Sequence, residues 1–197
     1  MNKKTLITIV GVPLFCLLLW AFSKLPRLMP PTQRTPAVKL QNLLLSVDDL
    51  VGAWFYYQVP IPYDSTDPRY WGEERLSLHE SIRRTDEKAW IRHSVFKFRN
   101  VYDSKRYQGD LRDSLYVMEG KNDILPYTSP YADYWYSACE NGLVNNLVVC
   151  EFFCRYDEFF SYVFISYDKQ NFTPSDFTQI LSIIDVRFNT QLNEINP

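Results

Sequence analysis

The hydrophobic positions of the chain follow three patterns in succession. Residues 5–23 form one uncharged run after a basic start. Between residues 54 and 167, short aromatic and β-branched stretches are separated by turn-forming residues, which is typical of strands. Near the C-terminus, apolar residues recur every three or four positions and predict a helix with one buried face: Phe177, Ile180, Leu181, Ile184 and Phe188.

The N-terminal run predicts a single transmembrane anchor or a signal segment. Residues 1–4 form a short tail, and the 18 residues of 5–22 just suffice to cross about 30 Å of hydrocarbon at ~1.5 Å each. The small residues Ala21 and Ser23 also suit a signal peptidase, so cleavage near Ser23 is the alternative to a retained anchor. We expect the lipid bilayer to be the partner of residues 5–22.

The charges around this run give conflicting signals about its orientation. Two lysines precede it and four basic residues follow it before the first acid, a count that favours a cytoplasmic C-terminal part. A dibasic start with a single hydrophobic segment is nevertheless the usual arrangement for export, and a long domain translocates despite flanking charge. We therefore expect a single-pass membrane protein whose C-terminal domain is extracytoplasmic.

A proline-rich stalk is predicted to separate the membrane segment from one folded domain. Residues 24–37 contain four prolines, which remove backbone donors and favour an extended chain. Residues 38–197 have the length of one ordinary domain with a single hydrophobic core.

The pattern in this domain predicts an α+β fold: an antiparallel sheet of five or six strands, packed against a C-terminal helix and a middle helix. Thr173, Pro174 and Asp176 provide a helix cap, a first-turn proline and an acid that reaches back to the cap. Ser46 before two acids predicts a short additional helix. The strands are expected over residues 54–59, 74–84, 88–99, 134–139, 147–156 and 160–167, and the two main helices over 103–117 and 173–192.

The hairpin of residues 74–99 allows its register to be predicted. A three-residue loop at 85–87 would pair Glu80 with Arg92 and Ile82 with Trp90 on the inner face. The same register would set His79 opposite His93 on the outer face. Because solvent-type residues surround both histidines there, we interpret them as solvated rather than as a shared metal site.

Cysteine spacing suggests one disulfide. Cys150 and Cys154 are four residues apart in a predicted strand, about 13 Å, which is too far for a bond between them. Cys139 can therefore pair with only one of the two, and a Cys139–Cys150 bridge would close a hairpin-sized loop. Cys154 would then be a buried free thiol. A metal site at these cysteines is disfavoured, because no histidine is nearby in the sequence.

Charge and motifs argue against several classes of function. Lys3 and Lys4 are the only charged residues before Lys24, so 19 basic and 23 acidic residues follow, a net charge of −4 that disfavours nucleic acid as a partner. No nucleophile elbow, phosphate-binding loop or zinc-protease motif occurs. We therefore expect no enzyme activity, no catalytic residues, no metal and no cofactor.

The loop after the first strand is the best candidate for a binding surface. Tyr63, Tyr70 and Trp71 lie near two prolines, and such aromatics supply contact area at low entropic cost. We expect a protein partner at this aromatic loop. A second set of aromatic residues alternates sides along its strand, so half of it should be core: Tyr127, Tyr131, Tyr134, Trp135 and Tyr136.

The sequence as a whole favours a membrane-anchored protein with a non-enzymatic, extracytoplasmic domain that binds, senses or supports a partner. Two alternatives remain open. A secreted ligand carrier, released by cleavage near Ser23, would need an apolar hollow between sheet and helix. A hydrolase would draw on the carboxylates near the aromatic loop, which are Asp64, Asp67, Glu73 and Glu74.

Overall fold

The protein divides into two compact units, Met1–Pro31 and Thr32–Pro197. This computed structural model describes residues 13–21, 39–62, 76–98, 100–114, 127–141 and 146–193. Residues 13–21 of the first unit are helical. Among the residues described, no helix combines the length and the apolar character needed to cross a membrane. The predicted stalk, residues 24–37, lies outside the described part of the chain.

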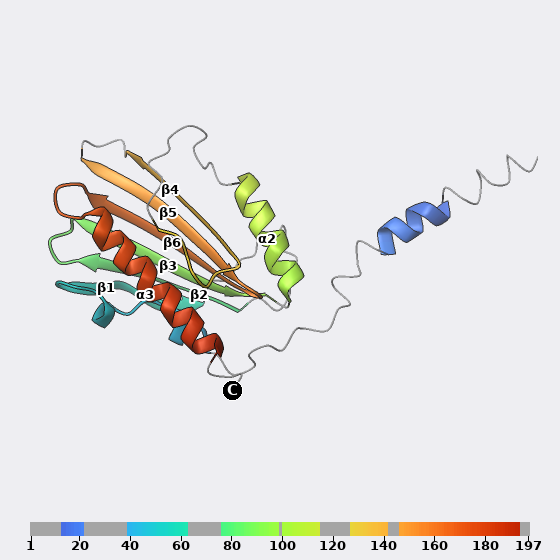
Figure 1. Cartoon of the computed structure of the whole chain (residues 1–197), viewed down its shortest axis with the longest axis horizontal. Coiled ribbons are helices and arrows are strands. Elements are labelled where there is room, and N and C mark those ends of the chain that lie inside the picture. The colour runs from blue at the N-terminus through green and yellow to red at the C-terminus, as the bar shows by residue number, and fades with distance from the viewer. Residues whose placement is uncertain are drawn as a thin grey trace, which may run out of the picture. The chain divides into compact units, whose positions relative to one another are not determined.

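The second unit is built on a six-stranded antiparallel sheet with the order β1-β2-β3-β6-β5-β4 (Figure 1). This confirms the predicted α+β fold, and the sheet has six strands, the larger of the two predicted numbers. β1 and β4 form the two edges, and the β5–β6 hairpin pairs with β3 near the middle. The strands are β1 (Trp54–Pro62), β2 (Leu76–Arg84), β3 (Ala89–Lys97), β4 (Tyr134–Asn141), β5 (Leu147–Tyr156) and β6 (Phe159–Asp168).

Two helices cover opposite faces of the sheet (Figure 1). Phe152 and Phe153 are neighbours on β5 and therefore point to opposite faces, and both are fully buried. Phe152 belongs to the core under α3 (Pro174–Asn193), whereas Phe153 packs in a smaller cluster with Tyr107 of α2 (Val101–Ser114). The predicted stripe of α3 is buried as expected, and α2 begins two residues earlier than predicted.

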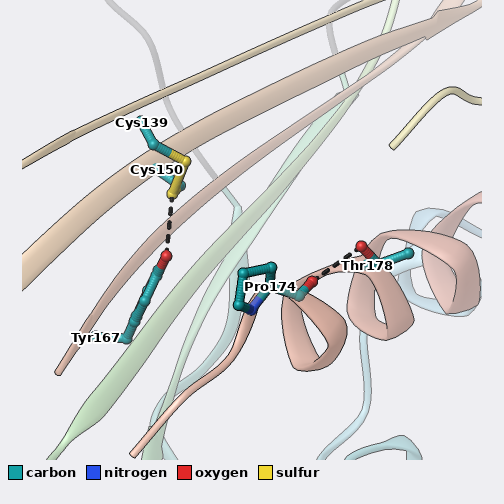
Figure 2. Close-up of a disulfide and its surroundings, with 5 residues drawn as sticks. All are labelled: Cys139, Cys150, Tyr167, Pro174 and Thr178. Carbon is teal, nitrogen blue, oxygen red and sulfur yellow. Dashed lines mark hydrogen bonds between the residues drawn. A yellow bond between two sulfur atoms is a disulfide. The ribbon is translucent and has the colours of Figure 1, made fainter. Parts of the chain in front are cut away.

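The ends of α3 and α2 follow from local side-chain hydrogen bonds. The Thr173 amide donates to Asp176 Oδ2 at 2.7 Å, and the Asp176 amide donates back to Thr173 Oγ1 at 3.3 Å. This is the predicted capping box, with Pro174 in the first helical position. One turn further, the Thr178 hydroxyl donates to the Pro174 carbonyl at 2.9 Å (Figure 2). Asn100 caps α2 by accepting from the Asp103 amide at 2.9 Å.

A short N-terminal segment, residues 39–50, lies against the α3 side of the sheet and is called the strap below. It contains two 3-10 helices, η1 (Leu40–Leu43) and η2 (Val47–Asp49), and η1 contacts β2, β3 and α3. Leu43, Leu44 and Leu45 are each at most 2 % exposed. The predicted short helix is a single 3-10 turn, η2, and Ser46 and Asp49 form the capping box at its start.

The β2–β3 hairpin has a different register from the predicted one. Residues 85–88 separate the strands, so the loop has four residues rather than three, with Glu87 at a positive φ of 58°. Asp86 stabilises the turn by accepting from the Lys88 amide at 3.1 Å and pairing with Arg84. Ile82 consequently pairs with Ile91, Glu80 with His93, and His79 with Ser94.

This one-residue difference exchanges the two faces of β3. Ile91, His93 and Val95 join the inner face in place of Trp90 and Arg92, since side chains alternate along a strand. The prediction that His79 and His93 share a solvated face was therefore wrong. His93 is fully buried on the α3 face, whereas His79 is half-buried on the opposite face.

The cysteines follow the predicted spacing argument. Cys139 and Cys150 are cross-strand partners on β4 and β5, with Cα atoms 4.0 Å apart and sulfurs at disulfide distance (Figure 2). The Tyr167 hydroxyl lies 3.9 Å from Cys150 Sγ. The hydroxyl is the donor, because a disulfide sulfur carries no proton. Cys154 is free and completely buried.

We expect the Cys139→Ser/Cys150→Ser double variant to lose about 3 kcal/mol of unfolding free energy, because a cross-link of this loop length restricts the unfolded chain by that amount. Urea titrations of the oxidised proteins measure the difference. Dithiothreitol should lower the wild type to the level of the variant and leave the variant unchanged. Equal stability of oxidised wild type and variant would contradict the bridge.

Candidate functional site

Polar side chains from three adjacent strands are buried beneath the strap. Glu80 of β2, His93 of β3 and Ser161 of β6 are each at most 1 % exposed. Burying such groups is unfavourable unless they find partners or lose their charge. The cluster of Glu80, His93 and Ser161, with Arg187 of α3 above it, is called the strap cluster below.

The strap fixes the protonation of His93. The Leu45 amide donates to His93 Nδ1 at 3.0 Å, so this nitrogen carries no proton. The other nitrogen, Nε2, lies 3.0 Å from Ser161 Oγ and donates to it in the neutral ring. Burial, assisted by the charge of Arg187, lowers the pKa of His93 to about 3. The imidazole therefore stays neutral at physiological pH.

His93 and Ser161 have the wrong arrangement for nucleophilic catalysis. A catalytic histidine accepts the serine proton at Nε2 while a carboxylate holds its Nδ1 proton. Here a backbone amide occupies Nδ1 and Nε2 donates to the serine. The pair thus positions the strap and provides no support for a hydrolase.

Glu80 is the unpaired member of the strap cluster. Both carboxyl oxygens are buried and have no hydrogen-bond partner among the described residues. Burial raises the pKa of Glu80 to about 8; the charge of Arg187 opposes this shift and that of Asp49 adds to it. The carboxyl is therefore mostly protonated at pH 7, which avoids leaving a bare charge in the core.

Arg187 joins α3 to the strap at two points. Its guanidinium donates to the Leu44 carbonyl, and also to both carboxylate oxygens of Asp49 at 2.7 and 2.6 Å. The Leu44 carbonyl and the Leu45 amide belong to the same peptide group, which is thus held by the Arg187 side chain of α3 and the His93 side chain of β3. The strap is clamped between helix and sheet by these polar contacts as well as by its leucines.

A second buried polar group lies further along the same face. Asp185 of α3 is 1 % exposed and accepts hydrogen bonds from Tyr127, Ser129 and Tyr156 at 2.8, 2.6 and 2.5 Å. These contacts tie the segment before β4 to α3. Burial raises the pKa of the adjacent Cys154 thiol well above its usual value, so Cys154 is an unreactive core residue.

The outer edge of β1 presents the most exposed apolar surface of the sheet. Phe55, Tyr57 and Val59 are 41 %, 61 % and 61 % exposed. The Arg83 guanidinium carbon lies 4.1 Å from the centroid of the Tyr57 ring, and that of Arg92 lies 5.0 Å from the Trp90 ring. Within the described part of the chain, neither arginine has an ion-pair partner.

The predicted site residues are only partly accounted for. Tyr63, Tyr70 and Trp71 of the aromatic loop lie outside the described residues, directly after β1, as do the four carboxylates Asp64, Asp67, Glu73 and Glu74. In the second aromatic set, Tyr127 is buried, Tyr131 is 47 % exposed, and the other three are half-buried. No cluster of three or more metal-ligating side chains occurs in the described ranges.

Sequence reasoning missed the strap cluster. Glu80 was placed correctly on the inner face, but the predicted register gave it Arg92 as a partner instead of His93. A charged residue between Leu78 and Ile82, on the apolar side of a strand, was the one available signal of a buried carboxyl.

We expect the stability of the protein to fall between pH 6.5 and 8 and the Glu80→Gln variant to lose this fall. An acid with a folded pKa near 8 binds a proton that the unfolded chain has released above pH 4.5. Stability is then lost as pH rises through this range, by up to about 1.4 kcal/mol per pH unit. The lowered pKa of His93 has the opposite effect on stability, but only below the unfolded pKa of 6.5. It therefore leaves the change between pH 6.5 and 8 unaffected.

Urea titrations at half-unit pH intervals measure this dependence. Glu87→Gln, which changes an exposed carboxyl in the hairpin turn, is the matched control and should keep the wild-type slope. An identical slope in wild type and Glu80→Gln would show that Glu80 is ionised in the folded state.

We expect Arg187→Met to loosen the strap. The substitution keeps most of the apolar stem but removes the donors to Leu44 and Asp49, for a loss of about 1.5–3 kcal/mol. Hydrogen exchange of the Leu45 amide should accelerate more than that of amides in β6. Arg92→Met, on the opposite face of the sheet, is the control; equal Leu45 exchange in the two variants would contradict the clamp.

No family model matches the chain, and no curated protein matches it. Among solved structures, the chain is similar to the crystal structure of the extracellular domain of PknH from Mycobacterium tuberculosis. The TM-score is 0.51 at 11 % sequence identity, and the match covers 79 % of this chain and 99 % of that one. The α+β domain described above therefore shares its fold with a bacterial extracellular domain.

Proposed function

We propose that the protein is a single-pass membrane protein whose extracytoplasmic domain binds or senses a partner without catalysing a reaction. The observation that carries this proposal is the match of the folded domain to nearly the whole of an extracellular domain. The domain follows an uncharged run of membrane-spanning length at residues 5–22. An anchor followed by a stalk and a binding domain is a consistent reading of both features.

The cysteine pair supports this compartment. Cys139 and Cys150 lie at disulfide distance on paired strands, and such bridges persist in oxidising environments outside the cytosol. An exported domain places these cysteines where the bridge is stable.

The proposed contact region is the aromatic loop with Tyr63, Tyr70 and Trp71. The strand that leads into this loop, β1, already exposes Phe55, Tyr57 and Val59. Rings of this kind dominate the energy of protein interfaces because they bury a large area at low entropic cost. A protein partner is thus the contact that this region suits best.

The packing under α3 gives no support to the alternative of a ligand carrier. The space where a hollow would have to lie is filled by Phe152, Phe177 and Phe188, each fully buried. Close packing of large side chains leaves their surfaces in contact with one another instead of with a ligand.

The topology is tested by protease treatment of intact cells that express the full chain, combined with carbonate extraction. We expect protease added outside to digest the domain, and the undigested protein to stay in the membrane pellet at high pH. A cytosolic loading control verifies that the cells remain closed.

Two results would contradict the proposal. Recovery of the intact chain from the aqueous fraction without detergent would exclude the anchor. A domain protected in intact cells and digested only after lysis would exclude export. A mature protein that begins near Ser23 by mass spectrometry would favour the secreted alternative.

A further inference from the structure

β1 is an open edge of the sheet with little protection against further pairing. It pairs with β2 along one side, and the sheet order places no described strand on its other side. Natural edge strands are usually blocked by charged residues, prolines or β-bulges. The first six residues of β1, WFYYQV, contain no charge and no proline; the prolines come at positions 60 and 62, and the register shifts lie between Tyr56 and Gln58 and between Gln58 and Ile61.

This edge is also apolar and exposed. Phe55, Tyr57 and Val59 are all more than 40 % exposed, and the register with β2 shifts at Tyr57 and again after Gln58. Exposed aromatic residues in a row along a free edge mark a surface that gains free energy when another chain covers it.

Arg83 brings a positive charge to this edge from the neighbouring strand. Arg83 is the cross-strand partner of Phe55, and its guanidinium carbon lies 4.1 Å from the Tyr57 ring centroid. The side chain therefore reaches across the surface of β1 toward the open side. No acidic residue occurs in β1, and Arg83 has no ion-pair partner among the described residues.

We propose that β1 takes up an extended, acidic segment of a partner protein as a seventh strand, with one of its carboxylates bound by Arg83 above Tyr57. This inference rests on the proposed role as a binding domain and names the chemistry of the partner. The backbone of β1 supplies the hydrogen bonds and Arg83 supplies the selectivity.

The chemistry of the edge favours a polypeptide over other occupants. Free backbone donors and acceptors at strand spacing are matched by another strand, which neither a lipid headgroup nor a nucleic acid provides. A second copy of this chain fits less well. β1 contains no acidic residue, so the β1 strand of a second copy would offer no carboxylate to Arg83.

The planar guanidinium has a specific part in this arrangement. Stacked on Tyr57, it keeps its edge donors available for a carboxylate, a geometry that a lysine ammonium does not reproduce. An acid should accordingly be required on the face of the added strand that Arg83 covers, and apolar or small residues suit the positions that alternate with it.

The test uses the full chain in nanodiscs of neutral phosphatidylcholine and a fluorescein-labelled nine-residue peptide that alternates Glu with Val, the length of β1. Fluorescence anisotropy should show saturable binding, and hydrogen exchange should show new protection of β1 amides. Arg83→Met should weaken binding about tenfold or more, and Arg83→Lys should restore only part of it. Arg92→Met, also stacked on a ring but two strands from the edge, should bind as the wild type does.

Two control peptides separate the parts of the interaction. A peptide with Lys in place of Glu should not bind, and a Glu peptide with alternate N-methylated amides should lose both binding and protection. Equal affinity of wild type and Arg83→Met, or binding without protection of β1, would overturn the proposal.

Two further outcomes would also overturn it. Protection of β1 that appears with rising protein concentration and no peptide would identify a second copy as the occupant. If no peptide binds while protease treatment still places the domain outside the cell, the acidic-strand inference fails and the anchored, exported role stands.

Discussion

A buried histidine ring needs a partner for each of its two nitrogens, and in this protein one of the partners comes from outside the sheet. The Leu45 amide meets His93 Nδ1, and the position of the strap on the domain depends on that contact. Without the strap, His93 would face α3 with an unpaired nitrogen, at a loss of about 1–3 kcal/mol. Arg187 supports the same arrangement from the helix side by holding the preceding carbonyl and Asp49. Strap, sheet and helix are therefore mutually dependent.

The same core contains a carboxyl that has no hydrogen-bond partner among the described residues. Glu80 lies between apolar neighbours on the inner face of β2, opposite His93. Since protonation removes its charge, the residue is tolerated at neutral pH. Asp185 shows the alternative solution on the same face, where three hydroxyl groups satisfy a buried acid. The two acids show that this core accepts polar groups by different means.

Local signals predicted the architecture well. The α3 capping box at Thr173, the apolar stripe from Phe177 and the strand pattern all act over a few residues, so the sequence alone shows them. The Cys139–Cys150 pairing also followed from spacing along predicted strands. The hairpin register did not, because it depends on one residue of loop length and on the left-handed conformation of Glu87. That single difference hid the strap cluster, and the contact of Arg187 with Asp49, 138 residues away, has no local signature at all.

The strap also determines where mechanical load enters the domain. It is the first described segment after the predicted stalk, so tension applied to the chain from its N-terminal side reaches the strap before any strand. The contacts of η1 and then the bonds from Arg187 and His93 bear that force, and β1 is loaded only after they break. Peeling of the strap, rather than unzipping of β1, is therefore the first step when such a pull unfolds this domain.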